Sequence, residues 1–251
     1  FLIHGGGLNI LLFKSISNYF DNDQPVYGLQ ALGLNHETNV PRTMNKIAKR
    51  YVKEILEVNP NGPYAIAGYS LGGFIAFEIA KELKIMGKEI KLLGIMDTYA
   101  GNNEIIDNKA NHIFRKVKRQ FHKVPFFTKS FINNPKEAIE YQLTVTKNKF
   151  EKIRSNSAVT KDVLTAYETE IYKNYNIAHN NYFLEPADLK LTLFRVAKRL
   201  YYLDDLVYLG WGKFAKQGVE VHEIPGDHKT FLFPPNDKMF AEILQKKLNS
   251  I

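Results

Sequence analysis

Short apolar runs alternate with longer segments whose apolar positions recur at helical spacing along most of this chain. The apolar runs predict strands at residues 2–3, 25–30, 64–67, 91–96, 189–196 and 218–224. Helices are expected at residues 8–19, 43–58, 71–86 and 238–248. Alternating strands and helices are typical of a mainly parallel sheet covered by helices on both faces, so we predict an α/β fold.

The alternation stops in the middle of the chain. From residue 98 to about residue 166 no strand is followed by a helix, and helical patterns rich in Lys and Asn take over. This stretch is too long for an ordinary loop of a compact domain. We therefore expect a single domain over residues 1–251 with a helical lid inserted at approximately 98–166.

The composition narrows the class of protein. The 251 residues suffice for one large α/β domain, and none is a cysteine, which excludes a disulfide framework, a thiol nucleophile and a cysteine metal site. No apolar run approaches the ~20 residues of a membrane-spanning helix, so we expect no membrane partner. With no visible signal peptide, these features fit a cytoplasmic location. The chain starts directly on its first strand, which suggests a piece of a longer protein.

The net charge of +8 is concentrated in the central insertion. Residues 109–154 hold twelve Lys or Arg and three Glu, a net +9, so the remaining residues sum to about −1. Such a segment is either a docking surface for an acidic partner or the solvated face of amphipathic helices. Nucleic-acid binding is the weakest interpretation, because no recognition motif accompanies the charge.

Gly68-Tyr69-Ser70-Leu71-Gly72 is the most informative motif of the chain. It reads G-x-S-x-G and lies between a predicted strand and a predicted helix. That context is the nucleophile elbow of an α/β-hydrolase, where a tight turn exposes the serine hydroxyl. We therefore predict that Ser70 is a nucleophile.

A serine hydroxyl needs an adjacent base to become a nucleophile, and in this fold the base is a histidine late in the chain. His222 and His228 are the late candidates. His222 falls inside a predicted strand, where its side chain would face a helix layer. His228 follows that strand at the carboxyl edge of the sheet, where catalytic groups gather, and we favour it as the base.

The acid that orients the base has three candidates. Asp97 directly ends the strand after the elbow unit, whereas Asp204 and Asp205 follow the next strand by several residues. A strand tip holds a carboxylate rigidly, so the pattern favours Asp97. The position after the next strand is, however, the commoner one for the acid of an α/β-hydrolase.

A glycine-rich loop after the first strand supplies the remaining part of such a site. An oxyanion hole needs two backbone N–H groups that converge on one point. We expect one from Leu71, directly after the nucleophile, and the other from Gly6 in the loop His4-Gly5-Gly6-Gly7. A plain glycine turn is the alternative, and a phosphate-binding loop is not supported because no G-x-x-x-x-G-K-[ST] pattern occurs.

Several segments together resemble a known family. They are Phe1–Gly7, Val26–Gln30, Gly68–Gly73, Ile95–Asp97, Leu209–Trp211 and Val219–His228. On these residues the chain resembles, essentially from end to end, the thioesterase domains that end nonribosomal peptide synthetases and related polyketide synthases. It departs from them at the first loop, where many members have a His-Pro-Ala-Gly-like sequence.

The resemblance implies roles for individual residues. In that family the acid follows the strand after the elbow, which supports Asp97 over Asp204 and Asp205. The triad would then be Ser70, Asp97 and His228. The long insertion would be a mobile lid.

The resemblance also implies a substrate and a partner. The domain would release an acyl or peptidyl chain from the phosphopantetheine thioester of a carrier domain, by hydrolysis or by macrocyclisation, through an acyl-enzyme. No bound cofactor and no metal are expected. Carrier domains are commonly acidic, so Lys116, Lys118 and Arg119 of the basic segment are candidate docking residues.

Three other functions use the same sequence features. A free-standing editing (type II) thioesterase would carry the same triad. A lipase or carboxylesterase would too, although the segment Leu209–Trp211 gives it no support. A catalytically inactive α/β-hydrolase that serves as a binding module usually lacks a triad member, whereas all three are present here.

Overall fold

The structure is a computed structural model that describes residues 1–35, 40–101, 166–197, 199 and 201–251, with short pieces between 123 and 143. It divides into two compact units. The first comprises Phe1–Glu104, Glu170–Lys198 and Asp205–Ile251, and the second comprises Ile105–Thr169 and Arg199–Asp204. The described pieces between 123 and 143 are helical, and apart from residues 98–101 and 166 the rest of the predicted lid lies outside the described residues.

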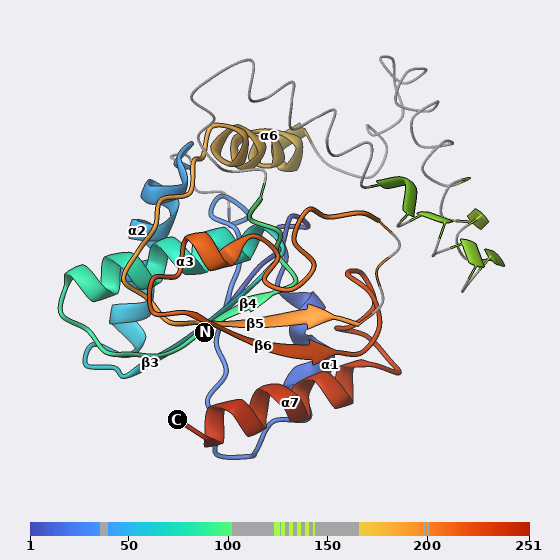
Figure 1. Cartoon of the computed structure of the whole chain (residues 1–251). Helices are drawn as coiled ribbons and strands as arrows, with labels where there is room; N and C mark the ends of the chain where they lie inside the picture. The colour runs from blue at the N-terminus through green and yellow to red at the C-terminus, as the bar shows by residue number, and fades with distance from the viewer. Residues whose placement is uncertain are drawn as a thin grey trace. The chain divides into compact units, whose positions relative to one another are not determined.

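Six parallel strands form the sheet of the first unit, in the order β2-β1-β3-β4-β5-β6 (Figure 1). Their bounds are β1 Leu2–Ile3, β2 Gly28–Leu29, β3 Tyr64–Tyr69, β4 Ile90–Met96, β5 Leu191–Val196 and β6 Val219–Ile224. Because all strands run the same way, their carboxyl ends share one edge of the sheet, and loops that follow different strands meet there.

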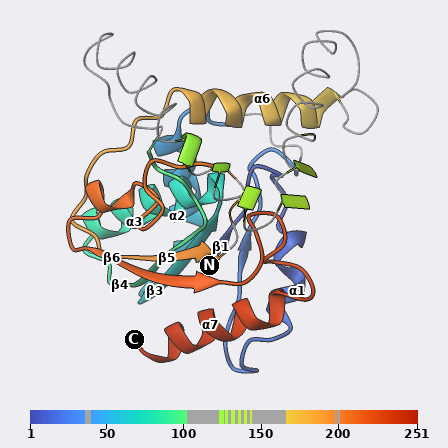
Figure 2. The same ribbon diagram turned by 45° about the vertical axis from the view of Figure 1, so that its right-hand side comes forward.

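Helices cover both faces of this sheet (Figures 1 and 2). Helices α2 (Met44–Val58) and α3 (Leu71–Ile85) pack together on one face, while α1 (Lys14–Ser17) and α7 (Asp237–Asn249) pack together on the other. The described residues also include the helices η1 Leu11–Phe13, α6 Ala166–Asn180 and η2 Trp211–Lys213. The α/β class with helices on both faces is therefore confirmed.

An aromatic cluster on the α7 face anchors the loop that follows β6. Phe194 of β5, Phe240 of α7 and Phe231 of that loop are fully buried. The Phe231 and Phe240 rings are perpendicular with centroids 5.0 Å apart, and Phe194 lies 5.7 Å from Phe240. Burial of each such ring contributes about 1.5–3 kcal/mol, so the loop is held to the core only three residues after His228.

Two elements near the N-terminus are shorter than the sequence pattern predicts. The helix expected at 8–19 is reduced to η1 and α1, because Leu8 has a left-handed backbone (φ 64°) and the Asn9 side chain accepts the Leu11 N–H. The strand expected at 25–30 is reduced to β2. Its partner β1 pairs only through Leu2 and Ile3, so the ladder has only two residue pairs.

Helix α6 is an element that the sequence analysis missed. It is rich in Tyr and Asn, which are weak helix formers, and so its propensity gave little signal. The signal that was available is the spacing of Ile171, Tyr175 and Ala178, which are buried at i, i+4 and i+7. Within the described residues, no helix combines the length and the apolar character needed to cross a membrane.

Candidate active site

Ser70 lies in a sharp turn between β3 and α3. Its backbone is strained, with φ 54° and ψ −115°, as the elbow motif predicts. The turn is fixed on both sides: the Ser70 N–H donates to the Met96 carbonyl at 3.2 Å, and the Ser70 carbonyl accepts the Thr98 hydroxyl at 2.7 Å. Ser70 is therefore held at the carboxyl edge of the sheet, directly before the first amides of α3, which have no acceptor inside the helix.

The two glycines of the motif allow the chain to pack this tightly. A Cβ atom on Gly68 would lie 2.0 Å from the Gly72 carbonyl oxygen, and a Cβ atom on Gly72 would lie 2.3 Å from the His4 carbonyl oxygen. Both distances are far inside van der Waals contact, so neither position tolerates a side chain. The elbow therefore depends on glycine at both places to bring β3, α3 and the loop after β1 together.

Asp97 follows β4 and is held in one orientation. It has a left-handed backbone (φ 51°), and its side chain is fully buried. Its N–H donates to the Phe194 carbonyl at 2.8 Å, and its Oδ1 accepts the Val196 N–H at 3.2 Å. The second oxygen, Oδ2, lies 2.8 Å from His228 Nδ1. Both carboxylate oxygens thus have partners that fix the direction of the side chain.

His228 approaches this carboxylate from the loop after β6. Since a carboxylate only accepts, the hydrogen bond places the proton on Nδ1 and leaves the Nε2 lone pair free. The His228 side chain is about 29% exposed, whereas the Asp97 side chain beside it is fully buried. Within the described part of the chain, no hydrogen bond joins Ser70 to His228, an arrangement common in free enzymes.

The other candidates for base and acid have structural partners. His222 lies in β6, stacks on the Phe194 ring at 5.7 Å and has Nε2 2.8 Å from Glu220. The Asp205 carboxylate accepts the backbone N–H groups of Val207, Tyr208 and Gly210 at 2.9–3.0 Å, and so stabilises a loop. Asp204 belongs to the second unit. Of the residues weighed from the sequence, the structure brings Asp97 and His228 together.

The glycine loop closes as a tight turn after β1. The Leu8 N–H donates to the Gly5 carbonyl at 3.0 Å, and Leu8 itself has φ 64°, a rare conformation for a branched residue. Gly6 lies within this turn, and Leu71 begins α3. The roles of Gly6 and Leu71 as oxyanion donors stay predictions. Lys116, Lys118 and Arg119 lie outside the described residues.

A buried hydrogen-bond network behind this loop escaped the sequence analysis. His4 is completely buried, with Nδ1 2.8 Å from the Gly5 carbonyl and Nε2 2.9 Å from the Tyr51 hydroxyl. The carbonyl can only accept, so Nδ1 carries the proton of a neutral imidazole. Burial lowers the pKa of His4 to about 4, which keeps the ring neutral near pH 7.

The network continues from Tyr51 of α2 to Tyr175 of α6. The Tyr51 hydroxyl lies 3.0 Å from the Tyr175 hydroxyl and 2.9 Å from the Gln30 carbonyl. Tyr175 in turn accepts the Leu32 N–H at 2.8 Å. Burial and the neighbouring Tyr175 raise the pKa of Tyr51, so the Tyr51 hydroxyl stays protonated. Two helices and the loop after β2 thereby hold the base of the glycine loop.

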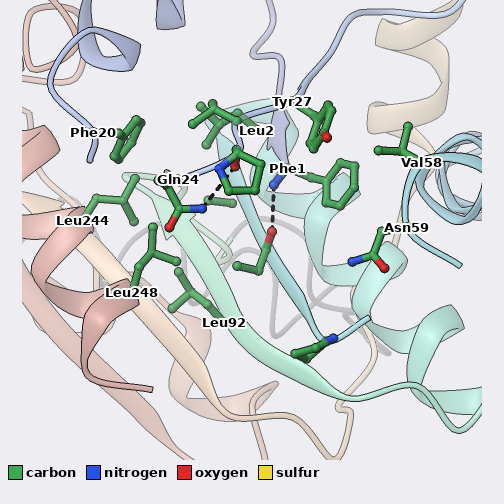
Figure 3. A pocket seen from close by; sticks show the side chains of 15 residues that line it. Phe1, Leu2, Phe20, Gln24, Tyr27, Val58, Asn59, Leu92, Leu244 and Leu248 are labelled. Atoms are coloured by element: carbon green, nitrogen blue, oxygen red, sulfur yellow. Dashed lines mark hydrogen bonds between the residues drawn. The ribbon is translucent and has the colours of Figure 1, made fainter. Parts of the chain in front are cut away.

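A cavity lies elsewhere, at the amino ends of the strands (Figure 3). It measures about 310 Å³ and is lined largely by apolar side chains, including Phe1, Tyr27, Val58, Leu244 and Leu248. Ser70, Asp97 and His228 lie at the opposite edge of the sheet and do not line this cavity. Among the described residues, no group of three His, Asp or Glu side chains could hold a metal ion.

Because His4 is buried and neutral, we expect the free energy of unfolding to depend on pH. Between pH 6.5 and about 4 the unfolded chain binds a proton at this position and the folded chain does not. The stability that the neutral His4 gives the folded chain is fully present above pH 6.5 and is lost as the pH falls to about 4. Over this range the free energy of unfolding falls by about 3 kcal/mol.

Denaturant unfolding of wild type and His4→Asn over this pH range measures the effect. We expect the difference in unfolding free energy between the two proteins to shrink as the pH falls from 6.5 to 4. A difference that stays constant over that range would contradict a buried neutral His4.

The thioesterase domain family model matches residues 1–248. Two relatives from Paxillus involutus are atromentin synthetase invA5, 40% identical over 97 residues, and inactive atromentin synthetase invA3, 43% identical over 100 residues. The matches cover 39% and 40% of this chain and 10% of each relative. The chain thus matches about a tenth of the length of these relatives.

Solved structures share the fold over nearly the whole chain. A four-domain nonribosomal peptide synthetase, holo-AB3403, superposes with a TM-score of 0.67 at 21% identity, covering 98% of this chain and 19% of that one. The NocB thioesterase domain superposes with a TM-score of 0.66 at 18% identity, covering 98% of this chain and 92% of that one. RedJ-thioesterase from Streptomyces coelicolor superposes with a TM-score of 0.63 at 16% identity, covering 98% of this chain and 84% of that one. With the family match over residues 1–248, the chain belongs to the thioesterase domain family and has its α/β-hydrolase fold.

Proposed function

We propose that this domain is a serine thioesterase that releases an acyl or peptidyl chain from the phosphopantetheine thioester of a carrier domain. The observation that carries the proposal is the 2.8 Å contact of His228 Nδ1 with the buried Asp97, at the sheet edge where Ser70 occupies the elbow. Acid, base and nucleophile occur in the chain order and in the loops that a serine hydrolase of this fold requires.

The chemistry follows from the protonation states in the site. His228 Nε2 takes the proton of the Ser70 hydroxyl as Oγ attacks the thioester carbonyl carbon. The Leu71 and Gly6 N–H groups stabilise the resulting oxyanion, each by about 3 kcal/mol. When the tetrahedral intermediate collapses, the C–S bond breaks, and the departing sulfur takes the proton from the His228 imidazolium.

The acyl-enzyme is then resolved by a second nucleophile. His228 removes a proton from a water molecule, or from a hydroxyl or amine within the acyl chain, as that group attacks the ester carbonyl carbon. Breakdown of the second intermediate returns the proton from His228 to Ser70 Oγ and frees the product. Water yields an acid, and an internal nucleophile yields a ring.

The relatives support the carrier partner. The relatives from Paxillus involutus are named as atromentin synthetases, and one superposed structure is a four-domain nonribosomal peptide synthetase. A domain of this family within such a protein would receive its substrate on a carrier domain of the same chain. One relative at 43% identity is named inactive, so activity has to be tested directly.

Covalent labelling tests the nucleophile. Intact mass spectrometry after mixing with an acyl-pantetheine thioester should show an acyl adduct on wild type and none on Ser70→Ala. Ser17→Ala, which removes an exposed serine from α1, should keep the adduct.

A fluorophosphonate provides a second probe, since the NocB thioesterase domain is described in covalent complex with one. A folded wild-type protein that acquires no adduct from either reagent would favour the inactive binding module. Faster turnover of a matching oxygen ester than of the thioester would favour a carboxylesterase.

Substitution of the acid tests the triad assignment. Asp97→Asn preserves the shape of the side chain but removes the charge that fixes the histidine tautomer, so kcat should fall by about 10⁴-fold. Asp204→Asn should leave kcat near the wild-type value. Steady-state kinetics on acyl-pantetheine measures both, and the reverse ranking would assign the acid to Asp204.

Charge reversal tests the docking segment. The triple variant Lys116→Glu, Lys118→Glu and Arg119→Glu should raise KM for a carrier-bound substrate, because a basic surface that meets an acidic carrier becomes repulsive. KM for soluble acyl-pantetheine should stay unchanged. Equal effects on both substrates would refute docking by these residues.

A control variant keeps the overall charge change the same. Lys46, Lys49 and Lys53 are exposed on α2, and their reversal to Glu alters the net charge by the same amount. This variant should leave both KM values near wild type. A rise in the carrier KM that matches the first variant would indicate a nonspecific charge effect.

A further inference from the structure

We propose that Tyr69, the residue before the nucleophile, is a positioning residue that holds both the general base and the glycine loop against the elbow. The proposal rests on the proposed function, which assigns Ser70 and His228 their roles. Tyr69 ends β3, and its side chain contacts two segments that lie far from it in the sequence.

The first contact is with the segment that carries the base. The Tyr69 hydroxyl donates to the backbone carbonyl of His228 at 2.7 Å, and the two rings lie 5.1 Å apart at an interplanar angle of 34°. Asp97 fixes the imidazole at Nδ1. His228 is therefore held at its main chain by Tyr69 and at its ring by Asp97, which leaves little freedom to rotate away from Ser70.

The second contact is with the glycine loop. A Cβ atom on Gly5 would lie 2.6 Å from Cδ1 and 3.0 Å from Cε1 of Tyr69, so the ring packs directly on the Gly5 backbone. Gly6, the predicted oxyanion donor, is the next residue. The tyrosine ring thus sets how closely the loop can approach the elbow.

The ring is itself seated on the core. Phe231 packs edge-on against Tyr69 at 5.4 Å and against Phe240 of α7 at 5.0 Å. Phe231 and Phe240 are both fully buried. A ring supported in this way can transmit the rigidity of the core to its two neighbours.

Because Tyr69 and Ser70 are adjacent, the position of the hydroxyl nucleophile and the position of the aromatic ring are set by the same strained backbone. Tyr69 therefore aligns the base His228, the nucleophile Ser70 and the glycine loop in one rigid unit. In a preorganised site, a misplacement of about 1 Å costs about 10²-fold in rate.

Two variants separate the hydroxyl from the ring. Tyr69→Phe keeps the ring contacts with His228 and Gly5 but loses the hydrogen bond to the His228 carbonyl. Tyr69→Leu loses the ring contacts as well as the hydrogen bond. We expect the single-turnover rate of acylation by acyl-pantetheine to fall about tenfold in Tyr69→Phe and about 10²-fold in Tyr69→Leu, with KM unchanged.

Tyr64→Phe is a matched control on the same strand. The Tyr64 hydroxyl also donates to a backbone carbonyl at 2.7 Å, that of Asn59, but at the other end of β3. This variant should lose thermal stability comparably to Tyr69→Phe and acylate at the wild-type rate. Equal kinetic losses in the two variants would mean that Tyr69 acts only through stability.

A second readout does not require turnover. The low-field ¹H NMR signal of the His228 Nδ1 proton reports its bond to Asp97, and it should broaden or shift in Tyr69→Phe and stay unchanged in Tyr64→Phe. Wild-type acylation and an unchanged signal in Tyr69→Phe would overturn the proposal. If wild type itself fails to acylate, the proposed function fails, while the NMR comparison still decides the positioning role.

Discussion

The hydrogen bond between His228 Nδ1 and the buried Asp97 is the interaction on which the whole site depends. It selects the imidazole tautomer whose Nε2 lone pair can accept a proton. The fold maintains it at a cost, because Asp97 has a left-handed backbone that few non-glycine residues adopt. Two hydrogen bonds to the neighbouring strand compensate for that cost: the Asp97 N–H donates to the Phe194 carbonyl, and Asp97 Oδ1 accepts the Val196 N–H.

A parallel sheet brings these groups together. Ser70 follows β3, Asp97 follows β4 and His228 follows β6, so residues separated by up to 158 positions meet at one edge. Strained backbones occur at that edge, at Ser70 and Asp97, and in the glycine loop at Leu8. A buried network behind the loop, from His4 through Tyr51 to Tyr175, ties it to α2 and α6. The site is therefore built from loops that the strands and helices hold in place.

The sequence predicted those parts of this architecture that have a local signature. The elbow was evident from five residues between a strand and a helix. The chain order that the fold imposes left two histidines and three aspartates as candidates; the place of His228 after its strand favoured it as the base, and the strand tip together with the family resemblance favoured Asp97 as the acid. The pattern was misleading where tertiary context decides: Asn9 and Leu8 interrupt a helix-like stretch, and β2 is limited by the short pairing segment of β1.

The contacts of His4 could not be found in this way. Its partner Tyr51 is 47 residues away, and Tyr175 is a further 124 residues along the chain. Each of these residues alone is an unremarkable core aromatic. Only the folded structure shows that the three polar atoms meet. The same holds for Tyr69, whose hydroxyl reaches a carbonyl 159 residues away.

The proposed mechanism requires Asp97 to hold His228 as the tautomer with its proton on Nδ1. ¹⁵N NMR of the histidine side chains, with His228 assigned by comparison with His228→Gln, measures this tautomer directly in the neutral form. We expect a protonated Nδ1 and an unprotonated Nε2 for His228 in wild type. A neutral imidazole with its proton on Nε2 could not accept the Ser70 proton there, and this result would rule out His228 as the base in this arrangement.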